Sequence, residues 1–176
     1  AWTLTLVPDR APEISFTETP AETARAALKV PFEARDDYGL QAAKIVIRRE
    51  GGEGTMELAL PLGGPRPGEA AETAYYDLTP HPWAGLPVTV QLAATDDLGQ
   101  EGRSEEHAII LPARVFQNLV ARAIVEQRRN LAEDPEVRET VAGALVLLSR
   151  LGPEFGDDIV VFLGLQAAAK RLRYDH

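Results

Sequence analysis

Hydrophobic and polar residues alternate with a period of two in seven segments between Pro12 and Pro112. This alternation is typical of strands that bury one face. The sixth segment is the clearest, because Val88, Val90, Leu92 and Ala94 share a face opposite Thr89, Gln91 and Thr95. Stretches rich in Gly and Pro separate several of the segments. We therefore predict an immunoglobulin-like antiparallel β-sandwich over residues 13–112. The residues expected to share one face in the other alternating segments are Ile14 and Phe16; Leu28, Val30, Phe32 and Ala34; Ala43, Ile45 and Ile47; Met56, Leu58 and Leu60; and Ala74, Tyr76 and Leu78. The seventh segment, residues 107–111, is apolar throughout.

One feature qualifies this prediction. Pro31 lies inside the second segment, where the missing N–H calls for a bulge or an edge position. Residues 1–12 read as a lead-in, with an alternating strand over Trp2–Val7 and an extended linker from Pro8 to Pro12. We expect that strand to be the last strand of a preceding domain or an added edge strand, and the chain to be a piece of a longer protein.

The period becomes helical at Val115, and we predict an α-helical segment over residues 113–176. Phe116, Leu119, Val120, Ala123, Ile124 and Leu131 form one stripe. Asp134-Pro135-Glu136 is a helix start with an N-cap, and Gly152-Pro153 ends that second helix. The fold class is therefore mixed β + α, a sandwich followed by a three-helix segment.

The third predicted helix, Ile159 to Arg173, is apolar nearly all round. Such a helix is normally buried on more than one side. We therefore expect a further surface to cover it, either a second copy or a remaining part of the protein. The candidate interface residues are Ile159, Val160, Phe162 and Leu163.

Charge separates the two segments. Residues 1–112 hold 9 basic and 18 acidic residues, whereas residues 113–176 hold 9 of each, so the net charge of −9 lies in the first part. An acidic surface repels phosphate groups, so we expect no nucleic-acid partner. The chain has no Cys, which excludes disulfides and a thiol nucleophile, and its longest apolar run is too short for a membrane span of about 18 residues.

A short motif occurs twice. Asp36-Asp37-Tyr38-Gly39 follows the second strand and Asp96-Asp97-Leu98-Gly99 follows the sixth, and in an immunoglobulin-like sandwich those two loops lie at the same end. One interpretation is a repeated turn in which Asp side chains bond their own backbone. The other is a calcium site made by Asp36, Asp37, Asp96 and Asp97, because Ca²⁺ takes several carboxylate oxygens.

Motifs that carry catalysis are absent from the sequence. No HExxH, GxSxG, P-loop or GxGxxG pattern occurs, so we expect no enzyme, no catalytic or cofactor-binding residues and no obligatory cofactor. Trp83 and Tyr75 are candidates for stacking on a sugar ring. A glycan-directed binder or enzyme, with an acidic pocket near Trp83, is one alternative, and a calcium-stabilised adhesion or envelope-spacer module is another.

Three phrases resemble the domain-of-unknown-function 4175 family. They are Pro8-Asp9-Arg10-Ala11-Pro12-Glu13-Ile14, the phrase from Asp36 to Leu40, and the run from Arg114-Val115-Phe116 through Ala121 to Arg129. The resemblance implies an uncharacterised inner-membrane protein of Gram-negative bacteria. It further implies a membrane anchor outside residues 1–176, a periplasmic location and a helical continuation, and it carries over no catalytic residues. We expect a non-catalytic interaction or scaffold module that binds a protein partner or itself through the helical segment.

Overall fold

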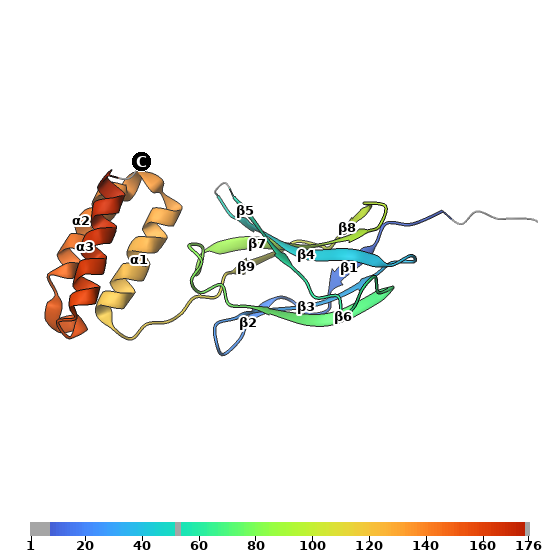
Figure 1. Ribbon diagram of the computed structural model, residues 1–176, viewed down its shortest axis with the longest axis horizontal. Coiled ribbons are helices and arrows are strands. Elements are labelled where there is room, and N and C mark those ends of the chain that lie inside the picture. The colour runs from blue at the N-terminus through green and yellow to red at the C-terminus, as the bar shows by residue number, and fades with distance from the viewer. Residues whose placement is uncertain (1–7, 52–53, 175–176) are drawn as a thin grey trace, which may run out of the picture. The chain divides into compact units, whose positions relative to one another are not determined.

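The computed structural model describes residues 8–51 and 54–174, so the lead-in strand predicted at Trp2–Val7 lies outside the described residues. The chain groups into two compact units. The first contains residues 1–79 and 86–112, and the second contains residues 80–85 and 113–176. The first unit holds the strands and the second holds the helices (Figure 1).

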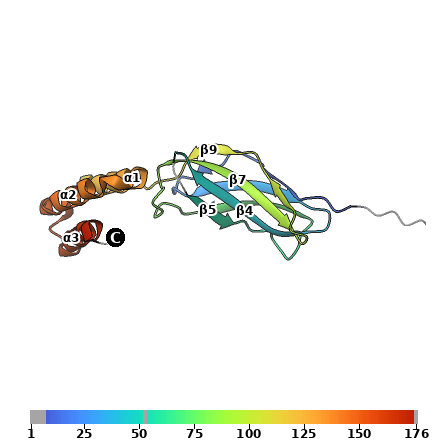
Figure 2. The same ribbon diagram turned by 90° about the horizontal axis from the view of Figure 1, so that it is seen from above.

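Two antiparallel sheets build the first unit. In one, β3 (Leu28–Arg35) pairs on one side with β1 (Glu13–Phe16) and β2 (Ala21–Glu22), and on the other with β6 (Glu69–Tyr76). The strands of the second sheet are β4 (Leu40–Arg49), β5 (Thr55–Ala59), β7 (Pro87–Asp96), β8 (Glu101–Arg103) and β9 (His107–Ile110). Their order is β5-β4-β7-β8, with β9 also paired to β7, and Figure 2 shows β4, β5, β7 and β9. Strands β4 and β7 correspond to the third and sixth predicted segments, and their pairing is the immunoglobulin-like arrangement.

The core lies between these sheets and follows the predicted alternation. Leu28, Val30 and Phe32 from β3 are fully buried, as are Ile45 and Ile47 from β4. Val88, Val90 and Leu92 of β7 complete the same layer and are also fully buried. At one edge, Gly102 of β8 approaches Pro12 so closely that a Cβ there would overlap the Pro12 carbonyl oxygen. The mixed β + α fold class is confirmed.

Two details differ from the predictions. The described residues contain nine strands, and the two that were missed, β2 and β8, are too short to show an alternating pattern. Pro31 occupies neither an edge nor a bulge, because β3 is central and its pairing with β6 is continuous. Pro31 is tolerated because it lies opposite the gap between the end of β1 and the start of β2, where no strand needs its missing N–H. On that side, Thr17 N donates to the Pro31 carbonyl oxygen at 3.2 Å.

The second unit contains helices α1 (Leu119–Glu133), α2 (Arg138–Ser149) and α3 (Ile159–Tyr174). The prediction that helical structure begins at Val115 is wrong, because Asn118 caps α1 by accepting a bond from Ala121 N at 2.9 Å. The predicted Asp134 cap is present, but it begins a 3₁₀ turn, Pro135–Val137, that leads into α2. Asp158 caps α3 through Val160 N at 2.8 Å.

Helices α2 and α3 make the most extensive helix–helix contact of this unit (Figure 1). Their shared core consists of Val141, Ala142 and Leu145 from α2 with Leu165 and Ala169 from α3. A polar link adds to it, since Gln166 Nε2 donates to Ser149 Oγ at 2.7 Å. Helix α1 packs on α2 less extensively.

Candidate functional site

The repeated Asp-Asp loops do converge at one end of the sandwich. Leu40, directly after the first loop, pairs with Asp96 at the start of the second. Arg66 lies between them, because its carbonyl oxygen faces Gly39 and its guanidinium contacts Asp97 at 2.9 Å. The predicted proximity of the two loops is therefore present in the structure.

The first aspartate of each pair stabilises its own turn. Asp36 Oδ2 accepts bonds from Tyr38 N at 3.0 Å and Gly39 N at 2.7 Å. Gly39 is needed there, because its φ is +112° and a Cβ would lie 2.9 Å from the Arg66 carbonyl oxygen. Asp96 is 1% exposed and accepts bonds from Gln100 N at 2.8 Å and Gln100 Nε2 at 2.9 Å. These contacts are those of the turn interpretation.

The second aspartates have different surroundings. Asp97 forms the surface ion pair with Arg66, whereas Asp37 lies beside Asp9 of the linker. The pKa of Asp9 is raised by burial first, then by a hydrogen bond with Asp37 and by the negative charges of Asp37, Asp96 and Asp36. One oxygen each of Asp9 and Asp36 is shielded from solvent without a hydrogen-bond partner. Sequence reasoning missed Asp9, because a linker residue carries no periodic signal.

A metal site does not follow from this cluster. Within the described residues, no group of three or more His, Asp or Glu side chains is arranged to hold a metal ion. Calcium binding by Asp36, Asp37, Asp96 and Asp97 stays a prediction.

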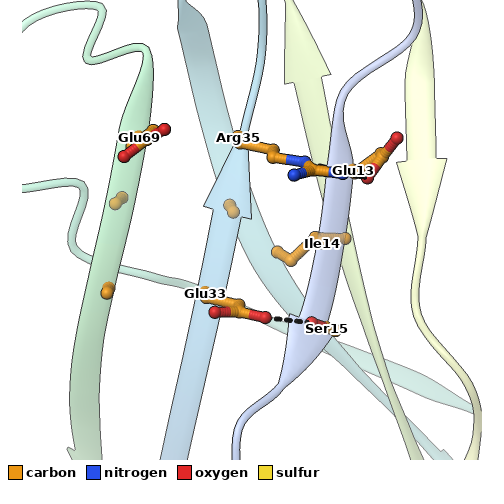
Figure 3. A pocket seen from close by; sticks show the side chains of 9 residues that line it. Glu13, Ile14, Ser15, Glu33, Arg35 and Glu69 are labelled. Carbon is orange, nitrogen blue, oxygen red and sulfur yellow. Dashed lines mark hydrogen bonds and ion pairs between the residues drawn. The ribbon is translucent and has the colours of Figure 1, made fainter.

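A hollow of about 420 Å³ lies on the outer face of the first sheet (Figure 3). Its polar side chains come from β1, β3 and β6, and its floor includes small residues such as Ala70 and Ala71. The charges are already paired in part, since Arg35 Nη2 contacts Glu13 Oε2 at 2.6 Å and Ser15 Oγ donates to Glu33 Oε1 at 3.2 Å. No aromatic residue lines this hollow, so it offers no platform for stacking a sugar ring.

The two aromatic candidates for glycan binding belong to different compact units of the chain. Trp83 is half-buried and packs edge-on against His81, with ring centroids 5.1 Å apart. Tyr75 is exposed on β6. Neither residue lines the hollow on the first sheet, and neither lines the groove between the helices of the second unit. A glycan-directed role stays a prediction.

The second unit carries a groove of about 670 Å³ that we call the helical groove. All three helices line it, and its apolar side chains include Ile124 and Leu131 of α1 and Leu165 and Leu172 of α3. The only charged side chains among the lining residues are Arg128 and Arg171. An apolar groove of this kind is suited to receive apolar side chains from another helix.

The predicted interface residues lie on α3 and are not part of the groove lining. Ile159 is 63% exposed, Val160 73%, Phe162 36% and Leu163 57%. The described chain therefore does not supply the burial expected for α3, of which only Leu165 and Ala169 are buried. Helical spacing places Val160, Leu163, Gly164, Ala167 and Arg171 on one side, which we call the open face of α3. Phe162 points from a different side and does not belong to it.

Sequence reasoning missed the residues that make the groove, Ile124, Leu131, Gly164, Ala168 and Leu172 among them. Ile124 and Leu131 belong to the predicted apolar stripe of α1, which indicates that they pack against another surface. The stripe does not predict a groove between α1 and α3. Among the described residues, no helix has both the length and the apolar character that crossing a membrane requires.

The comparisons with known proteins give a family and a distant structural likeness. The family described as Domain of unknown function (DUF4175) matches residues 1–176. No curated protein matches. Among solved structures, one titled "Crystal structure of Br derivative BhCBM56" is similar at 10% sequence identity and a TM-score of 0.27, covering 60% of this chain and 96% of that one.

Proposed function

The chain belongs to the DUF4175 family, whose function is unknown, and we propose that it is a non-catalytic interaction or scaffold module that binds a protein through its helical unit. The observation that carries this proposal is the apolar surface formed by the helical groove and the open face of α3. Large connected apolar surfaces on a folded chain mark sites of association.

The energetic argument rests on α3. Burying a Val, Leu or Ile side chain that was exposed contributes about 1.5–3 kcal/mol. Val160 and Leu163 are more than half exposed, and Ile159 is exposed at the helix start. Covering these three side chains therefore supplies several kcal/mol, which is a substantial part of the free energy of a specific complex.

Helix α3 is capped at its start and packed on its opposite side, so its exposed face does not result from an incomplete helix. Asp158 caps its first turn, and Arg173 Nε donates to Glu139 Oε1 of α2 at 3.1 Å near its end. Leu165 and Ala169 fix its opposite side against α2. A rigid helix that presents an apolar side is the usual donor for helix-in-groove recognition.

Site-directed photo-cross-linking in cells of the source organism tests the proposal. A benzophenone amino acid replaces Leu163 in one variant and Leu98 in the matched control, which is also exposed but lies in the sandwich. We expect a discrete protein adduct from position 163 and none from position 98. Equal adducts from both positions, or none from either, would contradict an interaction module of this kind.

A calcium-stabilised adhesion or envelope-spacer module is the second candidate. The observation that favours it is that the two loops carrying Asp36, Asp37, Asp96 and Asp97 converge at one end of the sandwich. A ligand that binds only the folded state raises the melting temperature. A higher melting temperature in calcium than in EDTA, lost in Asp37→Asn, would support this candidate, and identical melts would remove it.

The cellular location that we propose is the periplasmic side of the inner membrane, on a protein anchored outside residues 1–176. The family resemblance supports it. Protease treatment of intact spheroplasts tests the location, because a periplasmic segment is cleaved there and a cytoplasmic one is protected until lysis.

A further inference from the structure

We propose that the partner of the open face of α3 is the same face of a second copy of this chain, packed antiparallel about a two-fold axis. This inference rests on the proposed function and names its partner. The two helices would cross where Gly164 and Ala167 lie.

The middle of the open face allows close approach. Gly164 and Ala167 are exposed, and a Cβ built on Gly164 meets nothing within 4 Å, so no other part of the described chain occupies that space. The distance between packed helices is set by the side chains at their contact, and small residues permit the shortest distances. Leu163 flanks the crossing and supplies the apolar contact, and Val160 lies one turn further toward the start of the helix.

The ends of α3 carry opposite charges. Asp157 and Asp158 precede its first turn, and Lys170 and Arg171 lie in its last part; all four residues are exposed. A parallel pair would place like charges together, which opposes binding. An antiparallel pair places the acidic end of each copy beside the basic end of the other, and it also aligns the helix dipoles favourably.

The spacing of the open face is self-complementary. In an antiparallel pair that sets Gly164 opposite Ala167, the same register sets Val160 opposite Arg171. Each contact then occurs twice, as an isologous two-fold interface requires. The paired segment from Val160 to Arg171 has a length of about 17 Å, at about 1.5 Å per residue.

The helical groove extends this interface. Gly164, Ala167 and Arg171 belong both to the open face and to the groove lining, so the two surfaces are continuous. A large side chain of the second copy, such as Leu163, would enter the groove toward Ile124 and Leu131. An apolar surface alone would suit a partner of unrelated sequence. A second copy also carries the acidic and basic ends that match in an antiparallel pair, and this match favours a second copy as the partner.

Light scattering on the full chain tests the oligomeric state. We expect a dimer whose dissociation constant rises about tenfold or more in Gly164→Glu, because a charged side chain at the crossing must be desolvated. Gly143→Glu is the matched control on α2, since a Cβ at Gly143 also meets nothing within 4 Å. It should leave the dimer unchanged, and circular dichroism should show equal helix content in both variants.

Cysteine cross-linking tests the direction of packing, since the chain contains no Cys of its own. Mixing Val160→Cys chains with Arg171→Cys chains should give a disulfide between the two variants and few within either alone. Disulfides joining two copies of Val160→Cys would overturn the antiparallel arrangement.

The two proposals fail differently. A chain that stays monomeric at every soluble concentration, or a Gly164→Glu variant that dimerises as well as the parent, overturns the second copy as partner. If position 163 then cross-links a protein of another mass, the interaction module stands and only this inference fails.

Discussion

Asp96 and Asp97 are neighbouring aspartates, but the structure indicates that Asp96 contributes much more to stability than Asp97. Asp96 is buried and accepts two hydrogen bonds from Gln100, whereas Asp97 makes one ion pair with Arg66 at the surface. Replacing each in turn by Ala therefore separates a structural carboxylate from a surface one.

The magnitudes follow from these contacts. A hydrogen bond to a charged group contributes about 1.5–3 kcal/mol, and because Gln100 is half-buried, water can replace part of what is lost. Asp96→Ala should therefore lower the free energy of unfolding by about 2–4 kcal/mol. Exposed ion pairs contribute about 0–1 kcal/mol, so Asp97→Ala should cost no more than that.

Urea unfolding followed by far-ultraviolet circular dichroism measures both changes. For a domain of 60–100 residues, each kcal/mol shifts the melting temperature by about 4–8 °C, so Asp96→Ala should melt about 10 °C lower or more. Asp96→Asn should lie between, since its amide oxygen still accepts one of the two bonds. Equal losses for Asp96→Ala and Asp97→Ala would refute the assignment of Asp96 as the structural member of the pair.

Three further predictions concern the linker, the helices and the loops. The pKa of Asp9 is raised in the folded chain, so Asp9 stabilises the fold at pH values below its ordinary pKa of 3.8. This contribution to the free energy of unfolding is lost as the pH rises through the pKa of Asp9 in the folded state. Asp9→Asn should therefore be more stable than the parent at neutral pH and lose that advantage in acid, and unfolding curves across pH that run parallel would contradict this. Leu165→Ala should cost about 2–5 kcal/mol in urea unfolding of the monomer, whereas Leu163→Ala should cost under about 0.5 kcal/mol; similar costs would place Leu163 in the core. Gly39→Ala should destabilise the sandwich, because the φ of +112° and the nearby Arg66 carbonyl oxygen both oppose a Cβ, and an unchanged melting temperature would contradict that.

The long strands were predictable because one face of each is buried. The alternation of Val88, Val90 and Leu92 survives in the structure, since a shift by one residue would expose the whole set. The position of Pro31 was not predictable, because its tolerance depends on where β1 ends and β2 begins on the neighbouring strand. That is a property of pairing between distant segments, which a local pattern does not contain.

The candidate site was predictable in part for the same reason. The apolar sequence of α3 indicated a helix that needs cover, and two of its predicted interface residues, Val160 and Leu163, are exposed in the described chain. The helical groove depends on how α1 packs relative to α3, which the periodicity of neither helix determines. The convergence of the Asp loops followed from topology, whereas the roles of Asp36 and Asp96 as caps of their own turns required the hydrogen bonds.

The central claim is that a protein partner covers the open face of α3 in the cell. Thiol labelling measures this directly, with Leu163→Cys compared with Leu98→Cys, since the chain has no other Cys. In the dilute purified chain both positions should react with a maleimide, because both side chains are exposed. In intact cells of the source organism, mass spectrometry of the labelled peptides should show position 163 protected and position 98 modified. Equal modification of both positions in cells would contradict the account.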